Sequence, residues 1–125
     1  MARRPVVAVV DDDESVRESL PDLLRELGFA ASAFASAEDF LASDGLSNTG
    51  CLILDVAMPG LSGPELHQEL IRRGHDIPTI FITARADESL REKLLRQGAV
   101  ACLFKPFGDA ALRTALDAAL PSSRR

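Results

Sequence analysis

A few short stretches of this 125-residue chain carry side chains that could do chemistry together. Three consecutive carboxylates, Asp11, Asp12 and Asp13, follow the apolar run Val6–Val10, and Asp55 follows another apolar run. Carboxylates crowded together repel one another unless a hard divalent cation binds them, and Mg²⁺ prefers a few carboxylates and water as ligands. A metal ion there would lower the negative charge around one carboxylate, so that this group could attack an anionic phosphoryl donor.

Two further polar residues could stabilise such a transfer. Thr83 follows the apolar run 79–82, and Lys105 comes shortly after the run 100–103. A transferring phosphoryl group carries its charge on the equatorial oxygens, which an ammonium, a hydroxyl and backbone N–H groups can stabilise. Each residue alone also has a common structural role, since acidic residues often cap helices and a lysine is often a solvated charge. Together with the carboxylates, they predict a phosphoryl-transfer site.

The elements that must position these residues are visible as a repeated pattern. Short apolar runs alternate with amphipathic segments, and most runs are continuously apolar, as is typical of parallel strands covered on both faces. The runs are Val6–Val10, Ala30–Phe34, Cys51–Leu54, Thr79–Ile82 and Val100–Leu103. The segments between them place leucines at helical spacing. We therefore predict an α/β fold: a (βα)5 doubly wound parallel five-stranded sheet with the flavodoxin-like strand order 2-1-3-4-5.

The ends of the predicted strands indicate where the site lies. Ligands of an open parallel sheet bind beyond the carboxyl ends of the strands, near the point where the strand order reverses. Four of the five runs lead into the carboxylates, the threonine or the lysine, whereas the run 30–34 leads into Ala35 and offers no such group. This run suits an edge strand away from the site, and the polar groups should meet at one patch.

Composition limits the remaining possibilities. With 46% hydrophobic residues and a net charge of −5, the sequence predicts one globular domain over residues 1–125, with a core of about 5–120 and a tail or the start of a linker at 121–125. The negative charge argues against a nucleic-acid surface. Cys51 and Cys102 lie in apolar runs, so we expect reduced, buried thiols and a cytoplasmic protein. The sequence shows no membrane span and no signal peptide.

Four segments together resemble the receiver domain of two-component response regulators. The segments are VAVVDDDESVRESL, LILDVAMPGLSGPEL, TIFITA and LFKPF, and they span nearly the whole chain. The resemblance implies that Asp12 and Asp55 ligate Mg²⁺ directly with the carbonyl of Ala57, and that Asp11 holds the ion through water. The tail KPFGDAALRTAL is most similar to the subgroup with LuxR-type outputs.

The resemblance also implies a function. Asp55 would be the phosphoacceptor, Thr83 the switch hydroxyl and Lys105 the phosphate-binding cation, with a cis peptide bond between Lys105 and Pro106. The phosphoryl group would come from a histidine kinase or a histidine phosphotransfer protein, and the domain would relay the signal to an output domain or partner. Such a domain is not an enzyme beyond its own phosphorylation and dephosphorylation, binds no nucleic acid or membrane, and can form a homodimer on phosphorylation.

The sequence also predicts the surroundings of three other side chains. The family usually has an aromatic residue three positions before the lysine, where this chain has Cys102. Phe104 lies at a different position, and we expect its side chain on the opposite face of the strand. His67 lies beside Leu66 on the predicted third helix, where we expect a solvated imidazole.

Two alternatives come from other classes of protein. A haloacid-dehalogenase-type phosphatase also uses an aspartyl phosphate, and Asp11 and Asp13 match its D-x-D spacing, but Glu14 and Ser15 replace the Gly-Thr that should follow. Turnover of p-nitrophenyl phosphate would identify such an enzyme. A receiver-like interaction module that takes no phosphoryl group is the other alternative, and the complete set of polar residues argues against it.

Overall fold

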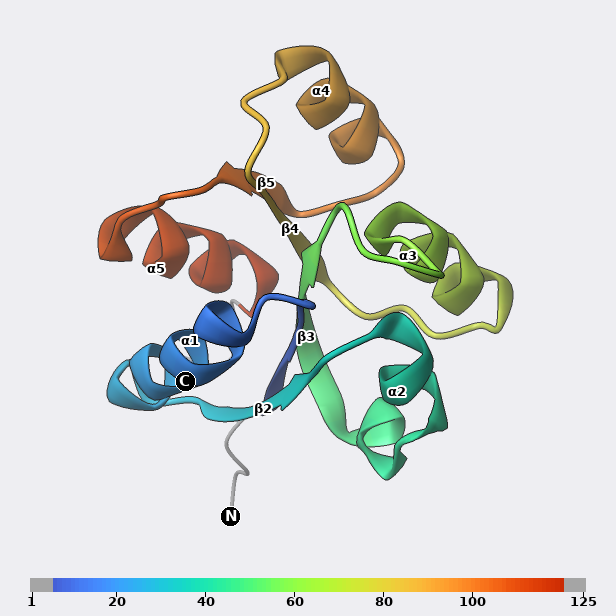
Figure 1. Ribbon diagram of the computed structural model, residues 1–125, viewed down its shortest axis with the longest axis horizontal. Helices are drawn as coiled ribbons and strands as arrows, with labels where there is room; N and C mark the ends of the chain where they lie inside the picture. The colour runs from blue at the N-terminus through green and yellow to red at the C-terminus, as the bar shows by residue number, and fades with distance from the viewer. Residues whose placement is uncertain (1–5, 121–125) are drawn as a thin grey trace.

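A computed structural model describes residues 6–120 of the chain. Strands and helices alternate along this part of the chain (Figure 1). The strands are β1 (Val6–Val10), β2 (Ala30–Phe34), β3 (Thr49–Asp55), β4 (Thr79–Thr83) and β5 (Ala101–Phe104). The helices are α1 (Glu14–Glu26), α2 (Ala37–Ala42), α3 (Gly63–Arg72), α4 (Glu88–Arg96) and α5 (Asp109–Ala119), with a 3-10 helix at Asp44–Asn48. The predicted tail 121–125 lies outside the described residues.

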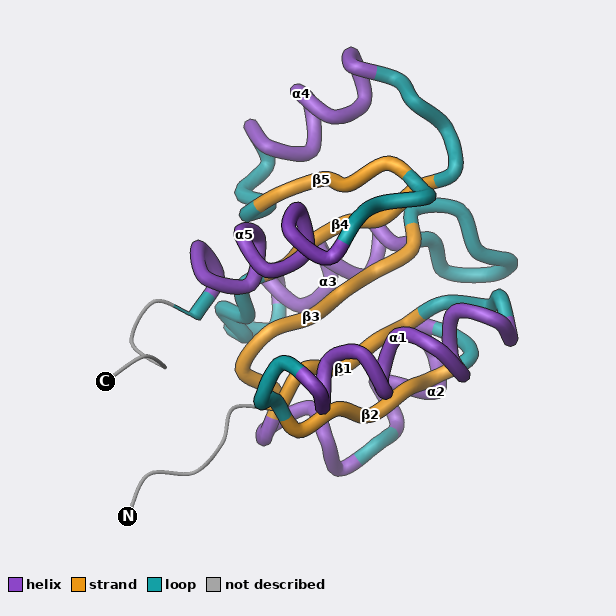
Figure 2. The backbone as a smooth tube through the Cα atoms, turned by 90° about the vertical axis from the view of Figure 1, so that its left-hand side faces the viewer, coloured by secondary structure: helices purple, strands orange, loops and turns teal. Residues whose placement is uncertain are grey.

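The strands form one parallel sheet in the order β2-β1-β3-β4-β5, as the sequence predicted. Helices α1 and α5 cover one face, and α2, α3 and α4 cover the other (Figures 1 and 2). Alternate residues of each central strand therefore enter two separate cores: in β1, Val7 and Val9 contact the first, and Ala8 and Val10 the second. Burial on both faces explains why the strand sequences are continuously apolar.

Side chains cap the N-terminal ends of several helices. Asp13 caps α1 by accepting a hydrogen bond from the Ser15 N–H, and Asp87 accepts one from Leu90 at the start of α4. Ser62 and Glu65 form a reciprocal capping box at the start of α3. Because these caps follow directly on β1, β4 and the loop after β3, they fix the segments that carry the polar residues. Among residues 6–120, no helix combines the length and apolar character that crossing a membrane requires.

The expectation of a solvated His67 is wrong. Its side chain is buried between α3 and the sheet, and the ring packs edge-to-face on Phe81 with 5.5 Å between centroids. Within the described part of the chain, its Nδ1 has no hydrogen-bond partner, and burial lowers the pKa of the imidazole. The buried stripe of α3 comprises Leu66, His67 and Leu70, which is the width typical of a helix that packs on a sheet.

The expected position of Phe104 is also wrong. Cys102 and Phe104 both pack in the core between the sheet and α2, α3 and α4, because residues two apart on a strand share a face. Cys102 is opposite Phe81 in β4, and Phe104 is opposite Thr83. The guanidinium carbon of Arg91, from α4, lies 4.7 Å from the centre of the Phe104 ring.

Candidate functional site

The carboxylates meet where β1 and β3 end side by side. Val10 is paired with Leu54, so that Asp11 and Asp55, the next residues of the two strands, are neighbours. Asp12 follows, and oxygen atoms of Asp11, Asp12 and Asp55 all lie within 4.8 Å of one another. Asp11 and Asp55 are buried, whereas Asp12 is exposed.

Asp13 has a different role from its two neighbours. Its carboxylate accepts a hydrogen bond from the Ser15 N–H as the cap of α1, and its own N–H donates to Oδ1 of Asp11 at 2.9 Å. Arg17, on the first turn of α1, donates to the Asp11 carbonyl. The start of α1 thus holds Asp11 in place, and leaves Asp12 free to face the solvent side of the cluster.

Lys105 reaches the same cluster from the end of β5. Its Nζ donates to Oδ2 of Asp11 at 3.0 Å and lies 3.5 Å from Oδ1 of Asp55. The backbone N–H of Lys105 donates to the carbonyl of Thr83 at 2.7 Å, which fixes the strand end beside β4. The peptide bond to Pro106 is cis, and this confirms the prediction from the sequence.

The electrostatics of Asp55 depend on these neighbours. The pKa of Asp55 is raised from 3.8 to about 6, first by burial and next by the Asp11 carboxylate, whereas Lys105 opposes the shift. For Lys105, burial alone would lower the pKa, but the two carboxylates Asp11 and Asp55 more than compensate and raise it. The cluster therefore carries more negative charge than one ammonium can balance, and it favours a second cation or a proton.

These side chains line one cleft of about 300 Å³ at the carboxyl edge of the sheet. The residues of the predicted site that line it are Asp11, Asp12, Asp55, Ala57, Thr83 and Lys105. Thr83 is buried, and its Oγ1 accepts a hydrogen bond from the Arg85 N–H at 3.1 Å. The hydroxyl proton is then available to a group in the cleft.

The donor set of this cleft fits a hard divalent cation. It offers carboxylate oxygens from three residues, one of them exposed, so that water can complete an octahedral shell. Ala57, an exposed residue of the β3–α3 loop, also lines the cleft. The surplus of negative charge around Asp55 points to the same type of ion.

Sequence reasoning missed Arg85, which lines the cleft two residues beyond Thr83. A lone arginine after a predicted strand gives no signal of its own, since such residues are usually solvated.

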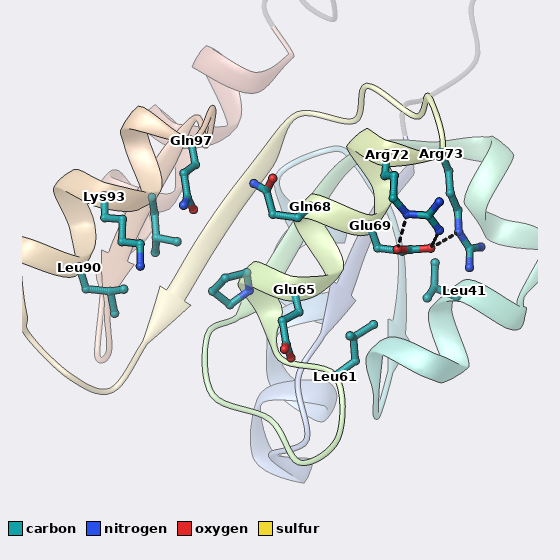
Figure 3. Close-up of a pocket in the computed structure, with 12 residues that line it drawn as sticks. Leu41, Leu61, Glu65, Gln68, Glu69, Arg72, Arg73, Leu90, Lys93 and Gln97 are labelled. Carbon is teal, nitrogen blue, oxygen red and sulfur yellow. Dashed lines mark hydrogen bonds and ion pairs between the residues drawn. The ribbon is translucent and has the colours of Figure 1, made fainter.

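A larger pocket, of about 590 Å³, lies between α3 and α4 (Figure 3). Leucines from α2, from the loop before α3 and from α4 line this pocket. The ion pairs of Glu69 with Arg72 and Arg73 also line it. It contains none of the clustered carboxylates, so the polar chemistry belongs to the smaller cleft.

Comparison with known proteins gives one family. Residues 7–117 match the family described as "Response regulator receiver domain". The chain is 43% identical over 122 residues to Nodulation protein W of Bradyrhizobium diazoefficiens, covering 98% of this chain and 54% of that protein. It is 43% identical over 117 residues to the transcriptional regulatory protein FixJ of Azorhizobium caulinodans, covering 94% and 56%. The chain thus spans about half the length of these curated relatives.

The fold agrees with solved structures. The crystal structure of FixJ-N superposes with a TM-score of 0.84 at 36% identity, covering 99% of this chain and 97% of that one. The response regulator StyR gives a TM-score of 0.87 at 42% identity, covering 98% of this chain and 62% of that one.

Proposed function

The chain belongs to the response regulator receiver domain family, and we propose that it is the phospho-accepting receiver of a two-component system. It takes a phosphoryl group onto Asp55 from the phosphohistidine of a histidine kinase or histidine phosphotransfer protein. The observation that carries this proposal is the environment of Asp55: a buried carboxylate at a strand end, within 4.8 Å of two other carboxylates and 3.5 Å from Lys105. A nucleophile, a metal-binding set and a phosphate-binding cation therefore share one cleft.

Asp12, Asp55 and the carbonyl of Ala57 would hold Mg²⁺ directly, and Asp11 would hold it through water. When bound, Mg²⁺ neutralises charge on the carboxylates and on the incoming phosphoryl oxygens. Asp11 has a second task, because its Oδ2 accepts a hydrogen bond from Lys105 and orients the ammonium toward Asp55.

The transfer itself needs little from the protein beyond position and charge. An oxygen of Asp55 attacks the phosphorus in line, the O–P bond forms as the N–P bond of the phosphohistidine breaks, and the electron pair remains on the imidazole nitrogen. The Lys105 ammonium moves from the Asp55 oxygen to a phosphoryl oxygen, and the Thr83 hydroxyl donates to another. In the later hydrolysis water attacks the phosphorus of the aspartyl phosphate, inorganic phosphate leaves and the Asp55 carboxylate is restored. The chemistry of the domain is then limited to its own phosphorylation and dephosphorylation.

The relatives give the wider setting of the proposal. One is named a transcriptional regulatory protein, and this chain matches 56% of its length. We therefore infer that this domain works in the cytoplasm ahead of an output domain, of the LuxR type, and that phosphorylation promotes a homodimer or a partner contact. The receiver itself carries a net charge of −5 and should not bind DNA.

The proposal is tested by phosphorylation in vitro. With Mg²⁺ and acetyl phosphate, intact-protein mass spectrometry should show one added phosphoryl group that is stable in acid and labile in base. Asp55→Asn should abolish the adduct, and Asp44→Asn, which neutralises an exposed carboxylate away from the cleft, should leave it unchanged. The same adduct on the Asp55→Asn protein would show that another residue is the acceptor.

A further inference from the structure

The loop between β3 and α3 carries Ala57; its first residue is hydrogen-bonded to the sheet, and its end is hydrogen-bonded back to that residue. The N–H of Val56 donates to the carbonyl of Ile82 at 3.0 Å, and the N–H of Gly63 donates to the carbonyl of Val56 at 3.1 Å. A Cβ at Gly63 would overlap the carbonyl oxygen of Asp55, so the end of the loop returns directly against the acceptor residue. Between these ends the backbone leaves the sheet and is exposed at Ala57.

The outer part of this loop is held by a residue far away in the sequence. Glu38, in the first turn of α2, accepts a hydrogen bond from the N–H of Leu61 through its Oε2, at 3.0 Å. The same oxygen lies 2.8 Å from the place where a Cβ at position 60 would be, and Gly60 has a φ of +74°. Only glycine combines this left-handed backbone with room for the carboxylate. The carboxylate therefore sits directly against the turn of the loop.

Apolar side chains of the same two segments share one core. Leu41, one helical turn after Glu38, and Leu61 both pack against the core on this face and line the pocket in Figure 3. Met58 is buried in the same core. Apolar packing thus limits how far the loop can move, and the Glu38 hydrogen bond selects its backbone conformation within that limit.

We propose that Glu38 is a positioning residue for the phosphoacceptor site: its carboxylate holds the β3–α3 loop in the conformation that offers the Ala57 carbonyl to Mg²⁺. This inference rests on the proposed function, because it assigns Glu38 a task at that site. The N–H of Leu61 is exposed, so water can replace Glu38 as its partner, and the domain should fold without the contact. What is lost is the fixed conformation of the loop, and partners that orient metal ligands commonly affect metal affinity strongly.

Three variants separate this role from a general effect of charge. Glu38→Ala removes the acceptor, and Glu38→Gln keeps an oxygen at the same place without the charge. Asp39→Ala removes a carboxylate from the same turn of α2 but leaves the Leu61 contact intact. Only Glu38→Ala should disturb the site.

The first measurement uses the metal-free, unphosphorylated protein in EDTA. Hydrogen exchange followed by NMR should show faster exchange of the Leu61 amide in Glu38→Ala than in wild type, Glu38→Gln and Asp39→Ala. Equal exchange in all four proteins would overturn the proposal, because Glu38 would then not hold the loop.

The second measurement is a Mg²⁺ titration followed by NMR shifts of the same proteins. The Mg²⁺ dissociation constant should rise about threefold to tenfold in Glu38→Ala, less than for a partner of a fully buried ligand, and stay near the wild-type value in the other two. With acetyl phosphate, Glu38→Ala should need more Mg²⁺ but reach the wild-type rate at saturation. An unchanged dissociation constant in Glu38→Ala, or an equal rise in Asp39→Ala or Glu38→Gln, would refute the positioning role.

The two measurements also separate this inference from the proposed function. If wild type binds Mg²⁺ but takes no phosphoryl group on Asp55, the proposed function fails, whereas the exchange and titration results still decide the role of Glu38. If phosphorylation proceeds and Glu38→Ala changes neither exchange nor Mg²⁺ affinity, the role of Glu38 alone is refuted.

Discussion

Replacing the acceptor Asp55 by asparagine should make the metal-free domain more stable at neutral pH. The carboxylate is 7% exposed and lies beside Asp11, and its pKa is raised from 3.8 to about 6, mainly by burial. Asp55 thus binds a proton more readily in the native state than in the unfolded chain. The stability that this protonation contributes is fully present below about pH 4 and is lost as the pH rises through about 6. Asparagine has the same size and no charge to bury.

The size of the effect follows from the pKa. A rise of about two pKa units at about 1.4 kcal/mol each makes the ionised Asp55 cost the native state about 3 kcal/mol above pH 6. The attraction of Lys105 is already included in this pKa. Because the amide must find its own hydrogen bonds in the cleft, we expect Asp55→Asn to gain about 1–3 kcal/mol at pH 7.5, an increase in Tm of at least about 3 °C.

The assay is thermal and urea unfolding in EDTA, followed by far-UV circular dichroism because the chain has no Trp or Tyr. The stability of Asp55→Asn relative to wild type should be lowest near pH 4 and rise to its full value above pH 6. Saturating Mg²⁺ should stabilise wild type more than the variant and so reduce the difference. Asp44→Asn, at an exposed position, should change little at any of these pH values. Equal or lower stability of Asp55→Asn at pH 7.5 in EDTA would refute the reasoning.

Three further outcomes are expected. Lys105→Met should slow phosphorylation by acetyl phosphate at least about tenfold, because the phosphoryl oxygens lose the ammonium that stabilises them. A mass-spectrometric time course measures this rate, and an unchanged rate would rule out Lys105 as the phosphate-binding cation. Because burial lowers the pKa of the His67 imidazole, this residue should lower native-state stability as the pH falls below about 6.5, and His67→Leu should remove that contribution. From pH 7.5 to pH 5 the urea midpoint should therefore rise more, or fall less, in His67→Leu than in wild type, and equal changes in both proteins would contradict the prediction. Cys102→Tyr should strengthen phosphorylation-dependent dimerisation in sedimentation velocity, because an aromatic ring at this position changes the exposed surface more than a thiol does; strong dimerisation of wild type that the variant leaves unchanged would contradict this.

The sheet and the cleft could be predicted because both depend on strand ends. Continuously apolar runs identify buried parallel strands, and the carboxyl ends of such strands meet at one edge whatever the details of packing. Asp11, Asp55 and Thr83 follow directly from this rule, and the structure places each of them in the cleft. The position of Lys105 does not follow from this rule alone, because it depends on the backbone after β5. The resemblance to the family implied the cis peptide bond that follows it.

The features that the sequence did not predict depend on packing between elements rather than on periodicity alone. His67 is polar and adjacent to the leucine stripe of α3, but the helix lies close enough to β4 for the imidazole to pack on Phe81. The hydrogen bond from Leu61 to Glu38 joins residues 23 apart, and no local pattern marks either of them as a partner. Contacts of this kind require the relative position of two helices or loops, which one sequence does not contain.

The pairing of β5 with β4 changes the interpretation of Cys102. Cys102 is 1% exposed and opposite Phe81, and its side chain is too small to expose much new surface by changing its rotamer. The aromatic ring next to Thr83 in this chain is Phe104, and Arg91 of α4 lies over that ring. A ligand shifts an equilibrium only as far as its interactions differ between the two states. We therefore expect a response to phosphorylation at this site to pass through the loop that follows Thr83 and through α4, where Arg91 contacts Phe104.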